Sequence, residues 1–139
     1  MEDCGAGQSS LPHNSLAPGE VWELEVWGQP RPKGSFYIRM FPTGPRGLMP
    51  PGTLSWEALV NAEAKKAWSS PPLTSPVKLK CTFYSHPRSL RRLDVDKLLR
   101  AILDALTGVV YNDDALVYSI EAIKLEGTPH VHIQLSHYP

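Results

Sequence analysis

The chain has 139 residues, 42% of them hydrophobic and 20% charged, and its 14 basic side chains balance its 14 acidic ones. This length fits one domain with a single core and leaves no room for two, while the composition is ordinary for a globular protein. No apolar run approaches the roughly 20 residues of a transmembrane helix, and no signal segment opens the chain, so we expect a cytoplasmic protein without membrane contact.

The first predicted elements are a tail and two extended segments. Residues 1–19 lack hydrophobic periodicity and predict a disordered tail, so the folded domain is expected over residues 20–139. The domain opens on a strand-like alternation whose inward residues are Trp22, Leu24 and Val26. A loop rich in proline and glycine leads to a second extended segment over residues 35–41, and residues 42–52 are assigned to no element.

The rest of the chain predicts two helices and three strands. Apolar residues recur at helical spacing from Thr53 to Trp68, and residues 77–84 alternate as a strand with a basic outward face. A second amphipathic helix is predicted from Asp94 or Val95 to Thr107, with Gly108 as its C-terminal cap. The last strands are expected over residues 117–125 and 131–135, joined by a turn. These elements predict an α+β fold with a mixed sheet of four to five strands and two main helices.

Acidic residues gather at both ends of the second predicted helix. Asp94 and Asp96 lie at its start, and Asp113 and Asp114 follow beyond its end. Carboxylate oxygens are the ligands of hard divalent cations, and neighbouring carboxylates repel one another unless solvent or an ion intervenes. A purely structural alternative is that Asp94 caps the helix and that Asp96 is a first-turn acid favoured by the helix dipole.

Basic residues adjoin these acids. Residues 31–100 contain thirteen bases against four acids, although the whole chain is neutral. Three arginines precede the first acid at positions 88, 91 and 92, and Arg100 follows Asp96 by four residues on the same side of the helix. Carboxylates beside a phosphate-seeking patch indicate a Mg²⁺-dependent nuclease, although folding can also intermix such charges into ordinary solvated faces.

Other candidate sites are weaker. His130 and His132 lie on the expected outer face of the last strand, without an acid or cysteine at metal-ligand spacing to complete a zinc site. Cys4 and Cys81 show no disulfide or metal spacing, which fits a reducing compartment. The tryptophans are expected in the core or at a dimer surface rather than as base-stacking platforms. These tryptophans are Trp22, Trp27, Trp56 and Trp68.

The segment from Asp94 to Asp114, DVDKLLRAILDALTGVVYNDD, resembles the RusA-like endodeoxyribonucleases, which resolve Holliday junctions in bacteria and their phages. It contains the Asp-x-Asp, Leu-Asp-Ala-Leu and Asp-Asp patterns in the family's order. The PRPKG run at residues 30–34 is similar to the family's Pro-x-Pro-Lys-Gly, and Lys124 falls where the family tends to place a lysine. The resemblance spans roughly Val21 to Leu135.

The resemblance implies a homodimer that cleaves four-way junctions or related branched DNA, encoded by a bacterium or a phage. It implies that Asp94, Asp96 and Asp114 are catalytic acids that hold Mg²⁺, with Mn²⁺ as an alternative ion. Arg100 stands where the best-known members have a catalytic lysine, and its guanidinium keeps the charge but cannot readily act as an acid. The DNA-binding residues are expected to be Arg31, Lys33, Arg88, Arg91, Arg92, Lys97 and Lys124.

Two alternatives of other classes remain open. One is a catalytically inactive dimer that shares the fold and binds branched DNA. The other is a structural partner in a phage or recombination assembly, in which the acids serve only as helix caps.

Overall fold

The computed structural model describes residues 16–33, 37–41, 44–48 and 52–139, with only the backbone of 37–41 and 44–48. The strands are β1 (Trp22–Trp27), β2 (Tyr37–Phe41), β3 (Gly44–Leu48), β4 (Val77–Ser85), β5 (Val117–Glu126) and β6 (His130–His137). The helices are α1 (Thr53–Ala67), α2 (Pro87–Leu90), α3 (Val95–Leu106) and the 3-10 turn η1 (Asp114–Leu116). The predicted tail lies outside the described residues up to residue 15, and residues 16–19 lead into β1.

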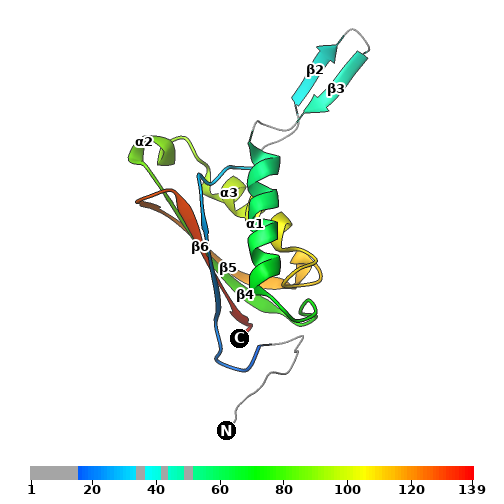
Figure 1. Cartoon of the computed structure of the whole chain (residues 1–139), viewed down its shortest axis with the longest axis vertical. Coiled ribbons are helices and arrows are strands. Elements are labelled where there is room, and N and C mark those ends of the chain that lie inside the picture. The colour runs from blue at the N-terminus through cyan, green and yellow to red at the C-terminus, as the bar shows by residue number, and fades with distance from the viewer. Residues whose placement is uncertain (1–15, 34–36, 42–43, 49–51) are drawn as a thin grey trace.

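The main sheet has four strands in the order β1-β6-β4-β5 (Figure 1). β6 runs antiparallel to both β1 and β4, whereas β5 runs parallel to β4. A parallel pair needs a crossover connection, and here α2, α3 and η1 supply it. The predicted turn at residues 126–129 does join β5 to β6, but the two strands are not neighbours because β4 lies between them.

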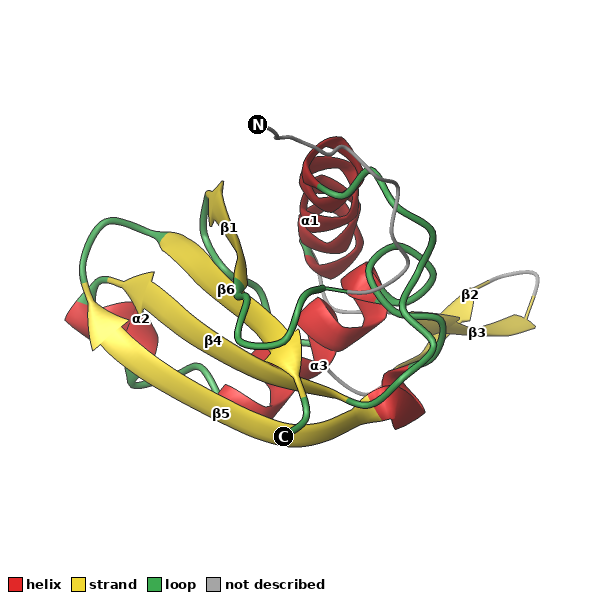
Figure 2. Cartoon of the chain, turned by 90° about the horizontal axis from the view of Figure 1, so that it is seen from below, coloured by secondary structure: helices red, strands yellow, loops and turns green. Residues whose placement is uncertain are grey.

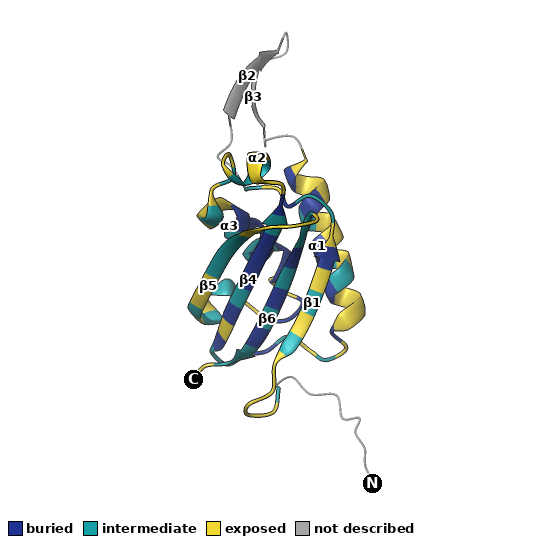
Figure 3. Cartoon of the chain, turned by 90° about the vertical axis from the view of Figure 1, so that its left-hand side faces the viewer, coloured by how far each residue is buried: buried dark blue, intermediate teal, exposed yellow. Residues whose placement is uncertain are grey.

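The helices α1 and α3 cover one face of this sheet (Figure 2). Every second residue of β4 and β6 points toward them, and the amphipathic faces of both helices complete the core as predicted. Fully buried core residues include Val60, Leu79, Phe83, Leu98, Ile102, Ile133 and Leu135. The other face of the sheet is not covered by a helix (Figure 3). The prediction of an α+β fold with a mixed sheet and two main helices is confirmed.

A second, two-stranded sheet was not predicted. β2 falls within the expected extended segment, but β3 occupies residues left without structure and pairs with β2 from Tyr37↔Leu48 to Phe41↔Gly44. The sequence of β3, GPRGL, has low intrinsic strand propensity, so its extended conformation comes from pairing with β2. Figure 1 shows this hairpin apart from the main sheet, beyond α1.

The tryptophans divide between core and surface. Trp56 and Trp68 are buried and Trp22 is half-buried, as expected, but 58% of Trp27 is exposed. Trp27 stacks on His130 at a centroid distance of 4.1 Å, and His130 stacks in turn on Tyr84 at 4.3 Å. His130 is therefore engaged between two aromatic rings on the uncovered face of the sheet.

Among the described residues, neither of the two longer helices combines the length and the apolar character that crossing a membrane requires.

Candidate functional site

The first pair of predicted acids lies at the start of α3. Asp94 is the N-cap residue, with an extended backbone, but its carboxylate makes no capping hydrogen bond to the helix. Its side chain is 64% exposed, and its nearest cation is the Lys97 ammonium at 3.4 Å. Asp96, in the first helical turn, is exposed as well. Both carboxylates are therefore available to a ligand from solvent, and the structural alternative lacks the bond that a side-chain cap requires.

Four of the predicted basic residues flank this pair along the chain. Arg88 lies on α2, and Arg91 and Arg92 follow in the segment that leads to Asp94; all three are exposed. Arg100 is exposed one helical turn after Asp96. The part of the chain that the structure describes gives none of these arginines a carboxylate partner, so their charges face solvent.

Lys124 takes a different position from the one expected of a DNA-binding residue. It is half-buried on β5, and its ammonium donates to the carbonyl oxygens of Leu90 at 2.7 Å and Leu93 at 2.6 Å. Leu90 is the last residue of α2, and Leu93 directly precedes Asp94. Lys124 thus anchors the backbone immediately before the acidic pair, a role that neither periodicity nor charge pattern in the sequence indicates.

We expect Lys124→Met to lower the free energy of unfolding by about 2 kcal/mol, because two partly buried carbonyls would lose a charged donor. Urea denaturation followed by circular dichroism measures the change. Lys78→Met, the same substitution at an exposed position of β4, serves as the control and should leave the midpoint unchanged. Equal midpoints for the two variants would contradict the anchoring role.

Lys33, which is partly buried, is likewise held by contacts within the protein. Its ammonium lies 2.8 Å from Glu57 on α1 and 3.2 Å from Asp104 on α3, and its backbone N–H donates to the Lys97 carbonyl at 3.0 Å. Burial alone would lower the pKa of Lys33, but the hydrogen bonds and ion pairs with both carboxylates outweigh it and raise that pKa. Lys33 therefore joins the loop after β1 to both long helices.

Asp114 lies at the opposite end of α3 from Asp94 and Asp96. The turn after the helix is fixed there, because the buried Tyr111 donates its hydroxyl to the Leu103 carbonyl at 3.0 Å. β5 then starts beside Val77, the first residue of β4, whereas α2 follows the last residue of that strand. A helix of 12 residues is roughly 18 Å long, so its two ends cannot share one ion.

The expected convergence of three carboxylates is therefore not found within one chain. Among the described residues, no three His, Cys, Asp or Glu side chains form a group that could hold a metal ion. Asp94 and Asp96 remain together, and Asp114 is separate with Asp113, whose carboxylate accepts a hydrogen bond from the Ala115 N–H at 2.9 Å. The spacing of these residues in the sequence did not reveal the separation, because spacing alone does not determine the path of the chain after the helix.

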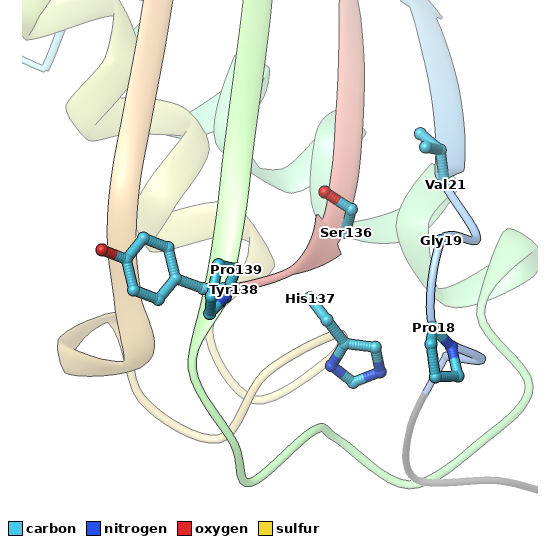
Figure 4. A pocket seen from close by; sticks show the side chains of 7 residues that line it. All are labelled: Pro18, Gly19, Val21, Ser136, His137, Tyr138 and Pro139. Carbon is cyan, nitrogen blue, oxygen red and sulfur yellow. The ribbon is translucent and has the colours of Figure 1, made fainter.

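Other features are remote from this chemistry. Burial raises the pKa of Cys81 to about 12, which leaves its thiol protonated and unsuited to nucleophilic attack. His132 contacts Glu23 at 2.7 Å across the β1–β6 pair. A cavity of about 520 Å³ opens where β6 ends and β1 begins, and in Figure 4 the His137 and Tyr138 side chains point to different sides of it. This cavity contains no acidic residue and lies at the end of the sheet opposite α2.

Comparison with known proteins agrees with the resemblance noted in the sequence. A family model described as endodeoxyribonuclease RusA matches residues 27–136. The match includes α3, both acidic pairs and every basic residue considered above. No curated protein matches the chain.

Proposed function

The chain belongs to the RusA endodeoxyribonuclease family, and from this premise we propose that it is a metal-dependent endonuclease of recombination and repair. Its substrate would be the Holliday junction or related branched DNA, met in the cytoplasm of a bacterium or of a phage-infected cell. The observation that carries the proposal is the exposed Asp94 and Asp96 pair beside three exposed arginines of the α2 segment. This arrangement offers oxygen ligands to a cation and positive charge to a phosphodiester backbone.

The carboxylates fit the preference of Mg²⁺, or of Mn²⁺, for oxygen ligands, but one chain supplies only two of the three expected. We infer that a homodimer completes the set, so that Asp94 and Asp96 of one protomer meet the partner's Asp114. A two-fold axis makes such an exchange reciprocal and generates two equivalent sites. When bound, the ion would supply Lewis-acid activation of water and compensation of the charge that develops on the phosphate.

The remaining residues have distinct tasks under this proposal. Arg100 stabilises negative charge on the phosphate but does not donate a proton, because a guanidinium stays protonated at all physiological pH values. Lys97, whose ammonium lies 3.4 Å from the Asp94 carboxylate, offsets the repulsion between the acids, and its exposed side chain is free to contact the DNA backbone. The arginines of α2 and the following segment hold flanking phosphates, so binding is expected to weaken steeply as salt rises.

We expect the protein to cut a synthetic four-way junction only when Mg²⁺ or Mn²⁺ is present, because two carboxylates and an arginine cannot by themselves activate water. Denaturing electrophoresis of end-labelled junction strands measures the cuts, and EDTA provides the control. Linear duplex of the same sequence tests the preference for branches.

The alternatives predict other results in the same assay. A catalytically inactive dimer retards the junction in a native gel but leaves every strand intact with either metal. A structural component of a larger assembly neither retards nor cuts it.

A further inference from the structure

A cavity of about 370 Å³ opens beside the acidic pair, between the loop after β1 and the segment that follows α2. Its lining residues are Gln29, Pro30, Arg31, Ser89, Arg92 and Leu93. The last of these directly precedes Asp94. The cavity therefore adjoins the segment that leads into the proposed site of cleavage, and two segments far apart in sequence form its walls.

Both walls are held by contacts within the protein. On one side, the Ser85 hydroxyl donates to the Gln29 side-chain oxygen at 2.9 Å, and the Gln29 amide nitrogen donates to the Pro30 carbonyl at 3.1 Å. On the other side, the Lys124 ammonium binds the Leu93 carbonyl at 2.6 Å. The cavity is thus preformed and needs little ordering when a ligand enters.

Arg31 is positioned by a glycine. Gly52, at the start of α1, has φ +84°, and a Cβ atom built on it would lie 3.2 Å from the Arg31 Nε and 3.5 Å from its Cζ. The arginine side chain therefore occupies the space that any larger residue at position 52 would fill. Arg31 is exposed, and its side chain runs past Gly52 while it also lines the cavity.

The lining suits one chemical class of ligand. Two guanidinium groups, a hydroxyl and a side-chain amide are present, and no carboxylate lines the cavity. Planar guanidinium groups bind phosphate oxygens with paired hydrogen bonds, and two of them more than offset the single charge of a phosphodiester. The volume is many times the roughly 30 Å³ that one water occupies, so a phosphodiester has room to enter.

We propose that this cavity, the Arg31–Arg92 pocket, binds one particular backbone phosphodiester of the DNA strand next to the phosphate that is cut. The inference rests on the proposed function. It assigns one shared phosphate to the two arginines, in place of a general electrostatic attraction to the whole DNA backbone. Such a contact fixes the register of the strand relative to Asp94 and Asp96.

Replacing single phosphates by neutral methylphosphonates tests the pocket. We measure junction affinity in EDTA for a series of junctions, each with one methylphosphonate near the branch point. For the wild type, one position in each bound strand should weaken binding roughly tenfold, the loss expected for one charge-assisted contact. In Arg31→Met or Arg92→Met, the same methylphosphonate should cause a smaller loss, because the remaining arginine still contacts the phosphate, and in the double variant it should cause no further loss.

Arg88→Met is the control, because Arg88 is exposed on α2 and does not line the pocket. This variant should bind more weakly overall and keep the full effect of the methylphosphonate. A similar small loss at many positions, unchanged in the Arg31 and Arg92 variants, would overturn the pocket while leaving the nuclease proposal intact. If one position is sensitive but the protein never cuts the junction, the nuclease proposal is overturned and the pocket stands. A protein that does not bind junctions would overturn both.

A pair of glycine variants separates the pocket from general loss of fold. Gly52→Ala should reduce the positional effect of the methylphosphonate, because its Cβ, 3.2 Å from the Arg31 Nε, requires the arginine side chain to shift. Gly19→Ala imposes a similar backbone penalty, at φ +81°, but its Cβ meets nothing within 4 Å, so binding and positional effect should stay as in the wild type. Thermal unfolding of both variants confirms that they are folded. A Gly52→Ala protein that retains the positional effect would show that Arg31 needs no such support.

Discussion

Asp96→Asn should slow cleavage of a four-way junction by about a thousandfold or more, because several kcal/mol of transition-state stabilisation depend on the ion that this carboxylate would hold. Asparagine has the same shape but a much weaker oxygen ligand. Junction affinity in EDTA should fall little or rise slightly, since removing a negative charge reduces repulsion of the phosphates. Single-turnover cleavage and gel retardation measure the two quantities separately.

The control for this variant is Glu121→Gln, which neutralises an exposed acid on β5 and should leave both quantities unchanged.

Thermal unfolding in metal-free buffer then separates catalysis from helix capping. If Asp94 served only as a helix cap, its variants Asp94→Asn and Asp94→Ala would be distinguished by their free energy of unfolding, and alanine would lower it by about 1 kcal/mol. Under our proposal, replacing Asp94 removes the repulsion between its carboxylate and that of Asp96, so the free energy of unfolding stays the same or rises. Undiminished cutting by Asp96→Asn would rule out this residue as a ligand.

Mixing two inactive variants, Asp96→Asn and Asp114→Asn, should restore nicking. If each site combines Asp94 and Asp96 of one protomer with the partner's Asp114, a heterodimer of these variants collects both defects in one site and leaves the other intact. Random exchange of subunits makes about half of the dimers mixed, so roughly a quarter of all sites become active. The products should be single nicks, because each active dimer has only one working site.

The matched control is a mixture of Asp96→Asn with Asp94→Asn. These residues lie together at the start of α3, so every site in that heterodimer contains a defect and no activity should return. Denaturing electrophoresis detects the nicks after subunit exchange, with each variant alone as the baseline. If all three acids served a site within one protomer, neither mixture would recover, and the composite site would be wrong.

The local pattern of the sequence predicted the main elements closely. The alternation that begins at Trp22, the helical spacing from Thr53 and the amphipathic segment from Val95 all became the expected elements, because each pattern reports burial of one face of a regular structure. β3 was missed because its glycines and proline carry no such pattern and only its partner strand makes it extended.

The sequence predicted which types of residue form the candidate site, but not how those residues are arranged in space. That Asp94 and Asp96 lie exposed at a helix start, beside arginines, follows from residues close together in the chain. Lys33 and Lys124 were predicted to bind DNA, and the structure shows that each also binds groups distant in the sequence, 24 to 71 positions away for Lys33 and 31 to 34 for Lys124. Long side chains with many rotamers take the partners that folding brings to them, and no sequence spacing records those partners.

The sequence by itself determined the main helices and the strands of the main sheet, the family and the chemical character of the candidate ligands, because these depend on residue type and short-range order. Only the tertiary structure decided that α3 keeps Asp114 away from Asp94 and Asp96, and that Arg31 and Arg92 line one cavity. The physical reason is that a helix is a rigid rod that separates its ends, whereas β1 and β4, both antiparallel to β6, end at the same edge of the sheet and bring the segments that follow them together.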